Sequence, residues 1–93
     1  MPAEASCVVV TLPAALVALF PGCAGRHVVT ADTVAAAIAQ VDRAWPGLRD
    51  RLCDSSPALR RHIRVFVAGE SVGLDAPLAP GDEVFVLTAI SGG

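Results

Sequence analysis

The last two residues, Gly92 and Gly93, carry the group in this chain that is most open to chemistry. They follow an apolar, strand-like run over residues 83–91, so the terminal carboxylate sits on a short tether without side chains. An α-carboxylate has an ordinary pKa of roughly 3.3–3.7, so it is ionised at neutral pH and can attack a phosphorus atom. The same anion is a poor electrophile, and acyl transfer from it requires prior activation. Because glycine has no Cβ, this end could enter an active site too narrow for other residues. A frayed end without function is the alternative for a Gly-Gly pair taken alone.

The cysteines and histidines show no spacing that predicts a site. Cys7, Cys23 and Cys53 are odd in number and form no Cys-x-x-Cys pair, and none stands at a zinc-ligand spacing from His27 or His62. We expect buried or incidental thiols, with no disulfide framework and no metal site.

The chain has one cluster of charge, formed by Arg60, Arg61 and Arg64 with His62 between them. A solvated edge just before a strand is the preferred interpretation, and a dedicated anion or partner site is the alternative. Over the whole chain seven arginines oppose nine acidic residues, for a formal net charge of -2. This balance lacks the strongly basic surface of a nucleic-acid-binding domain. There is no lysine, so the protein offers no side-chain amine as an acceptor in amide-forming chemistry.

The apolar stretch over residues 7–20 has neither the pattern of a signal peptide nor the length of a membrane span. No positive charge precedes it and Pro13 interrupts it. At about fourteen residues it is shorter than the twenty or so that a bilayer requires. We therefore expect it to form core, in a cytoplasmic protein with no membrane partner.

The elements that would position the tail follow from hydrophobic periodicity. Val34, Ile38, Val41 and Trp45 form a single apolar stripe typical of a helix, with Asp32 or Thr33 as its N-cap. Trp45 is interpreted as core filling. Shorter helical turns are expected within residues 14–20 and 48–53, and Pro21-Gly22, Pro46-Gly47 and 79–82 read as turns. The segments with strand character are 6–12, 26–30, 64–68, 71–74 (turned by Gly69-Glu70) and 83–88.

The first and last strands are the most apolar along their length, which suits central strands covered on both faces. A helix between the first hairpin and the later strands would cover one face. The pattern predicts an α+β fold, the β-grasp (ubiquitin-like) architecture, with a mixed four- to five-stranded sheet and one main helix packed on one face. Residues 1–93 would form a single domain, with 89–93 as a flexible reactive tail.

The element order, the turn over residues 80–84 into the last strand, and the closing Ala-Ile-Ser-Gly-Gly resemble the ThiS/MoaD family of ubiquitin-like sulfur carrier proteins. The resemblance covers the whole chain in length and element order, and its specific part is the final strand and tail. Within the family, residues 54–57 and 64–67 look most like the CysO branch, which serves cysteine biosynthesis in actinobacteria. Gly69-Glu70 departs from the Asn-Asp-type turn that such proteins often carry, although turn residues interchange easily.

The resemblance implies that an E1-like adenylating enzyme, using ATP and magnesium, activates the Gly93 carboxylate and that sulfur transfer then yields a thiocarboxylate. Ile90, Ser91 and Gly92 would thread into the partner's site. A sulfur-accepting synthase would consume the sulfur for cysteine, a cofactor such as molybdopterin or thiamin, or a sulfur-containing secondary metabolite. A metalloprotease-type hydrolase could restore the tail. The chain itself would bind no cofactor and supply no catalytic group, so it would be a carrier and co-substrate, not an enzyme.

The same resemblance places a docking face beside the tail. Alternate residues of a strand share a face, so Phe85 and Leu87 point to one side of the last strand and Val84 and Val86 to the other. Counted back from the terminal glycines, the Phe85 and Leu87 face is the one away from the helix, where this family carries an apolar patch for the activating enzyme. Phe66 would be its third member. The alternative is that these three side chains fill a small core.

Two other functions stay open on the sequence. A ubiquitin-like modifier would be joined through Gly93 to lysines of other proteins, and a β-grasp binding subunit would use no covalent chemistry at its end. Conversion to a thiocarboxylate favours the carrier, a ladder of protein adducts favours the modifier, and function after deletion of Gly93 favours the binding subunit.

Overall fold

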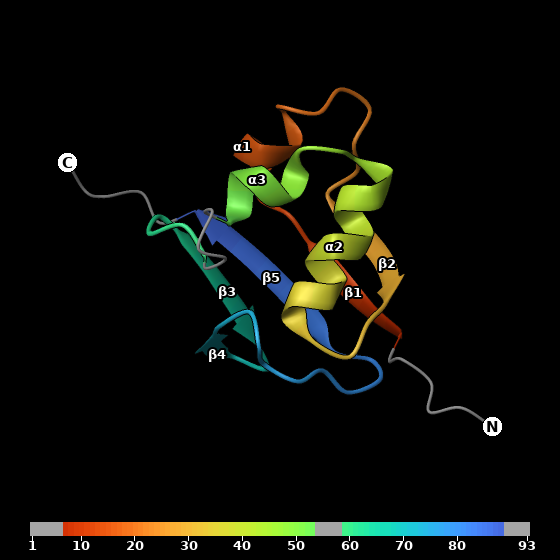
Figure 1. The fold of residues 1–93 in the computed structure, drawn as a ribbon, viewed down its shortest axis with the longest axis vertical. Helices are drawn as coiled ribbons and strands as arrows, with labels where there is room; N and C mark the ends of the chain where they lie inside the picture. Colours follow the sequence, from red (N-terminus) through yellow and green to blue (C-terminus); the bar gives the residue numbers. More distant parts are fainter. Residues whose placement is uncertain (1–6, 54–58, 89–93) are drawn as a thin grey trace.

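The computed structural model describes residues 7–53 and 59–88, which form one five-stranded sheet with three helices (Figure 1). The elements are β1 (Cys7–Thr11), α1 (Ala14–Val17), β2 (Arg26–Thr30), α2 (Val34–Ala44), α3 (Leu48–Leu52), β3 (Ile63–Val67), β4 (Glu70–Val72) and β5 (Glu83–Thr88). No helix in these two stretches is both long enough and apolar enough to pass through a bilayer.

The strands lie in the order β2-β1-β5-β3-β4, so the first and last strands are neighbours inside the sheet, as their apolar sequences predict. β1 pairs in parallel with β5, while β1 with β2, β3 with β5, and β3 with β4 are antiparallel. A mixed sheet with the crossing helix α2 between its two antiparallel halves is the β-grasp arrangement. The predicted fold class is confirmed.

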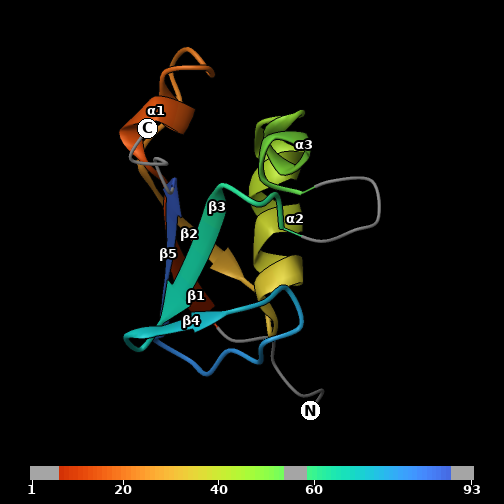
Figure 2. The same ribbon diagram turned by 90° about the vertical axis from the view of Figure 1, so that its left-hand side faces the viewer.

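The helices α2 and α3 cover one face of the sheet, and α1 lies near the end of the sheet that β5 reaches (Figure 2). The buried core lies between the sheet and α2 with α3. Its fully buried side chains are Val8, Val10, Val34, Ile38, Val41, Leu48, Leu52, Val65, Val84 and Val86. The opposite face of the sheet carries no helix among the described residues, and it is called the open face below.

Helix α2 begins and ends where its sequence directs. The Thr33 hydroxyl oxygen accepts a hydrogen bond from the Ala36 backbone N–H at 3.1 Å, so Thr33, not Asp32, is the N-cap. The helix ends at Ala44, and Trp45 is its half-buried C-cap residue, packed against the core. Gly47 then takes a φ of 99°, a left-handed conformation that glycine adopts without strain, and α3 starts after it.

The hairpin between β3 and β4 differs from the sequence prediction by one residue. The turn is Ala68-Gly69, with φ of 53° and 82°, and not Gly69-Glu70. Two central residues at positive φ suit the twist of a two-residue hairpin, which places Glu70 opposite Val67 inside β4. The predicted strand over 71–74 is therefore β4 at Glu70–Val72, and β3 starts at Ile63 instead of residue 64.

Candidate functional site

The residues predicted to react or to thread, Ile90, Ser91, Gly92 and Gly93, lie outside the described residues, as does the predicted tail over 89–93. The structure follows β5 to Thr88, five residues before the last residue of the sequence. The site is therefore described from the end of β5 and the surfaces around it.

The side chains of β5 alternate between core and solvent. Val84 and Val86 are 0% and 1% exposed on the helix side, whereas Phe85 and Leu87 are 39% and 46% exposed on the open face. This agrees with the orientation predicted from strand parity. The apolar residues of β5 thus lie on two faces of the sheet. One face is buried in the core, and the other is exposed to solvent.

The neighbouring strand β3 extends this surface. Phe66 lies directly opposite Phe85 in the antiparallel register and is half-buried, and Arg64 lies opposite Leu87. Phe66, Phe85 and Leu87 therefore share the open face, and they are called the apolar patch below. Cross-strand neighbours on one face have Cβ atoms about 4.5–5.5 Å apart, so the two phenylalanines are neighbours on this surface.

The apolar patch is separate from the core. None of its three residues belongs to the buried cluster, whose strand members include Ile63, Val65 and Val67 on the other side of β3. The alternative in which these side chains fill a small core does not describe Phe85 or Leu87. Their role in docking a partner stays a prediction.

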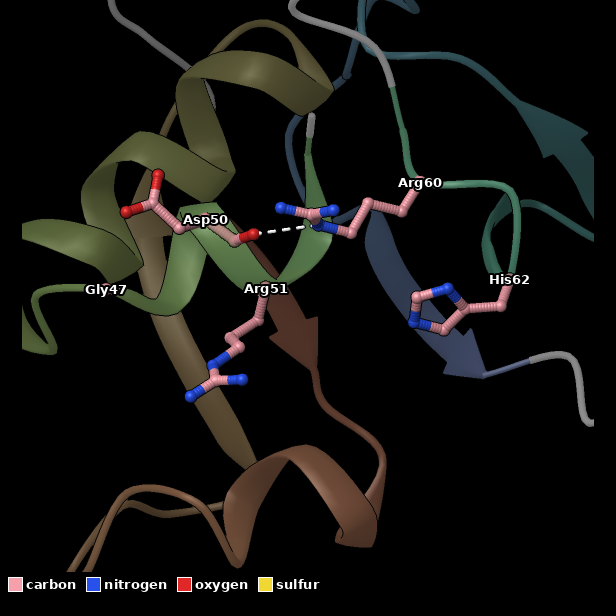
Figure 3. A pocket seen from close by; sticks show the side chains of 5 residues that line it. All are labelled: Gly47, Asp50, Arg51, Arg60 and His62. Atoms are coloured by element: carbon pink, nitrogen blue, oxygen red, sulfur yellow. Dashed lines mark hydrogen bonds between the residues drawn. The ribbon is translucent and has the colours of Figure 1, made fainter. Parts of the chain in front are cut away.

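A hollow of about 560 Å³ lies beside α3, at the end of the sheet where β5 stops. Gly47, Asp50, Arg51, Arg60 and His62 line it (Figure 3). The Arg60 Nε–H donates to the Asp50 backbone carbonyl at 2.9 Å, while the Asp50 carboxylate is turned away from the Arg51 and Arg60 guanidinium groups. Of the cationic cluster predicted at residues 60–64, Arg60 and His62 therefore line a concave surface.

Arg51 is the residue of this surface that the sequence did not single out. It lies nine positions before Arg60, and the two meet because the Arg60 backbone N–H donates to the Leu52 carbonyl at 2.8 Å, which ties the chain before β3 to the end of α3. A hydrogen bond between two segments distant along the chain leaves no trace in local residue spacing. The helical pattern at 48–52 was the only available signal, and it does not predict where that helix packs.

Two of the three thiols lie in the core. Cys23 and Cys53 are buried and Cys7 is exposed. Burial raises the pKa of the Cys23 thiol, and the Cys23 Sγ lies 3.5 Å from His27 Nε2, which is 2.7 Å from the Ala24 carbonyl oxygen. Across residues 7–53 and 59–88, no three His, Cys, Asp or Glu side chains gather closely enough to hold a metal ion.

The similarity of this chain to known proteins assigns it to a family. The model of the ThiS family matches residues 11–93, which include the apolar patch, the cationic hollow and the terminal glycines. The chain belongs to the ThiS family. It is 37% identical over 83 residues to the sulfur carrier protein CysO of Mycobacterium tuberculosis, covering 81% of this chain and 89% of that protein.

Solved structures of similar proteins share the fold of this ThiS-family chain. CysO in the Amycolatopsis orientalis BexX/CysO complex matches with a TM-score of 0.82 and 31% identity, over 92% of this chain and 99% of that chain. SAMP1 of Haloferax volcanii, a small archaeal modifier protein, matches with a TM-score of 0.77 and 29% identity, over 92% of this chain and 98% of that chain. The predicted resemblance to CysO-like sulfur carriers is confirmed, and the curated relatives are carriers by name, not catalysts.

Proposed function

We propose that this protein is a sulfur carrier whose Gly93 carboxylate is adenylated by an E1-like enzyme and converted to a thiocarboxylate. The observation that carries the proposal is the likeness to the CysO sulfur carrier, together with a family match that extends through the terminal Gly-Gly.

The proposed steps require no catalytic group on this chain, and each bond that forms is matched by a leaving group. A Gly93 carboxylate oxygen attacks the α-phosphorus of magnesium-bound ATP, and pyrophosphate leaves, which gives an acyl adenylate. A sulfur nucleophile at the sulfide level then attacks the acyl carbon, and AMP leaves with one carboxylate oxygen. The terminal thiocarboxylate next serves as the nucleophile in a synthase, and hydrolysis of the resulting acyl bond returns the carboxylate.

The apolar patch would dock the activating enzyme. Exposed large apolar side chains grouped on one face are what a transient protein interface needs. Phe85 and Leu87 precede Gly93 by only eight and six positions, so an enzyme that holds the tail is close to the patch. The complex of CysO with BexX in Amycolatopsis orientalis supports a partner protein for this chain.

Intact-mass spectrometry tests the proposal. The chain is incubated with an E1-like enzyme from the same organism, ATP, magnesium and sulfide, and its mass is measured. Replacement of one oxygen by sulfur supports the carrier, and an unchanged mass under conditions where the enzyme turns over ATP argues against it.

A ubiquitin-like modifier is the second candidate, and the likeness to SAMP1 favours it. The absence of lysine would prevent side-chain-linked chains of this protein but not its attachment to others. In a lysate of the source cells, a ladder of adducts through Gly93 would support the modifier. Adducts that persist when Gly93 is deleted would count against attachment through Gly93, and pathway function that survives the deletion would count against both covalent roles.

A further inference from the structure

Basic side chains gather around the point where β5 ends. Arg51 and His62 line the 560 Å³ hollow beside α3 and also a second hollow of about 220 Å³, whose other walls include Leu16, Ile63 and Thr88. Thr88 is the last residue of β5, so the two hollows together connect the end of the last strand with the cationic surface. A third hollow shares Arg60 and His62 and adds Arg61.

Arg51, Arg60 and Arg61 form no ion pair with an acidic side chain within the described part of the chain. The ion pair there joins Arg26 and Glu83, at 3.4 Å on the open face. Arg60 donates to a backbone carbonyl, and Arg64 donates to the Arg61 carbonyl at 2.8 Å. Charges that no described acidic side chain matches remain available to a ligand.

Several acidic residues lie at the other end of the sheet, whereas Asp42 and Asp50 lie beside the arginines of α3. Glu70 follows the β3–β4 turn, Asp82 precedes β5, and Asp32 precedes α2, and all three segments are at the end opposite the end of β5 (Figure 1). A molecule with net charge -2 thus has a positive end, and it is the end from which the tail follows. Such a charge asymmetry orients a protein during its approach to an oppositely charged surface.

The tail is short, so any enzyme that binds it must come close to the end of the domain where β5 stops. Five residues span at most about 17 Å when fully extended. An active site that holds Gly93 therefore lies within that distance of Thr88, which shares the smaller hollow with Arg51 and His62. The charges on this end of the chain indicate which charge the partner's surface should carry.

We propose that Arg51, Arg60 and His62 form a second docking surface, which binds acidic side chains on the rim of the activating enzyme's tail-binding site. The inference rests on the proposed function and extends it from the apolar patch to the opposite side of β5's end. A protein surface fits better than a free anion, because the three groups come from separate segments and face open hollows. Arg guanidinium groups pair well with carboxylates through two parallel hydrogen bonds.

The test compares Arg51→Glu with Arg49→Glu. Both arginines are exposed on α3 and both changes alter the net charge equally, but Arg49 lines neither hollow. In ATP–pyrophosphate exchange by the activating enzyme, Arg51→Glu is expected to lower kcat/KM by about fivefold to tenfold, mostly through KM, and Arg49→Glu by less than about twofold. The deficit of Arg51→Glu should shrink as salt is raised from low ionic strength.

Equal effects of the two variants would overturn the docking surface, because net charge alone would then explain both. A loss confined to kcat would also overturn it. Matching thermal melts show that each variant is folded. A wild-type chain that supports no exchange contradicts the proposed function itself, which separates the two failures. Inorganic phosphate can be titrated to millimolar concentration while the NMR chemical shifts of Arg60 and His62 are followed. Shift changes that saturate, together with inhibition of exchange, would show a free-anion site instead.

Discussion

At the scale of single residues, Leu87 and Val86 show how adjacent apolar side chains differ in what they can do. Val86 is fully buried on the helix side of the sheet, and its volume is part of the core. Leu87 is nearly half exposed on the open face next to Arg64, so its replacement leaves the core intact. The exposed fraction, and not hydrophobicity, separates a stability residue from a candidate recognition residue.

Leu87→Arg is expected to lower kcat/KM for adenylation by about tenfold or more, because a charge would replace a central apolar contact of the interface. Its melting temperature should stay close to that of the wild type. Val28→Arg is the matched control, since Val28 is 72% exposed on the edge strand β2, two strands away from β5. Normal adenylation of Leu87→Arg would remove Leu87 from the docking face.

Gly92→Ala is expected to slow activation without changing the free energy of unfolding. A Cβ at this position would obstruct passage through a narrow tail channel, and alanine also restricts the backbone. Initial rates of adenylation and urea denaturation, measured on the same preparation, check both parts. A marked fall in stability would show that Gly92 has contacts in the folded domain and would contradict the tail assignment.

At the scale of elements, α2 and β5 were predictable because their patterns are long and regular. The four-three-four spacing of the apolar residues in α2 and the unbroken run of β5 indicate the correct structure and faces. The turn at Ala68-Gly69 was misplaced by one residue, because alanine rarely takes a positive φ and so gives no turn signal. Arg51 was missed since only the packing of α3 against the segment before β3 brings it to the site.

The N-cap of α2 offers a test at this scale. Thr33→Ala should lower the free energy of unfolding by about 1 kcal/mol, because the Ala36 N–H loses its acceptor. Thr33→Ser should retain most of the stability. Asp32→Ala, which removes the other cap candidate, is expected to cost less than half as much. Chemical denaturation ranks the three, and an Asp32 effect equal to that of Thr33 would contradict the observed cap.

At the scale of the whole molecule, composition makes the alkaline behaviour of this protein unusually simple. The chain has neither lysine nor tyrosine, so above neutral pH only the three thiols and the α-amino group titrate, while arginine stays charged. Burial raises the pKa of the Cys23 thiol in the folded state. A group whose pKa is higher when folded stabilises the protein below its unfolded pKa, near 8.5 for a thiol, and loses that contribution as pH rises.

The free energy of unfolding should therefore fall as the pH is raised above about 8.5 under reducing conditions. Cys23→Ala should flatten this dependence, because it removes the buried thiol. Urea denaturation at a series of alkaline pH values measures the slopes. Identical slopes for the wild type and Cys23→Ala would show that Cys23 ionisation is not linked to unfolding.

The whole molecule also determines what the terminal glycines mean. The β-grasp domain places an apolar patch on the open face and a cationic surface beside the end of β5, and β5 ends five residues before Gly93. Recognition and reaction are thus assigned to different parts of one chain. The domain would be recognised, and the tail would be modified.

The most direct measurement of the central claim is the location of sulfur in the reaction product. Wild-type protein is treated with the activating enzyme, ATP, magnesium and sulfide, and the intact product is fragmented in the mass spectrometer. The predicted result is sulfur in place of oxygen in the fragment that ends at Gly93. An unmodified C-terminal fragment, or sulfur added at Cys7, Cys23 or Cys53 as a persulfide, would contradict the claim.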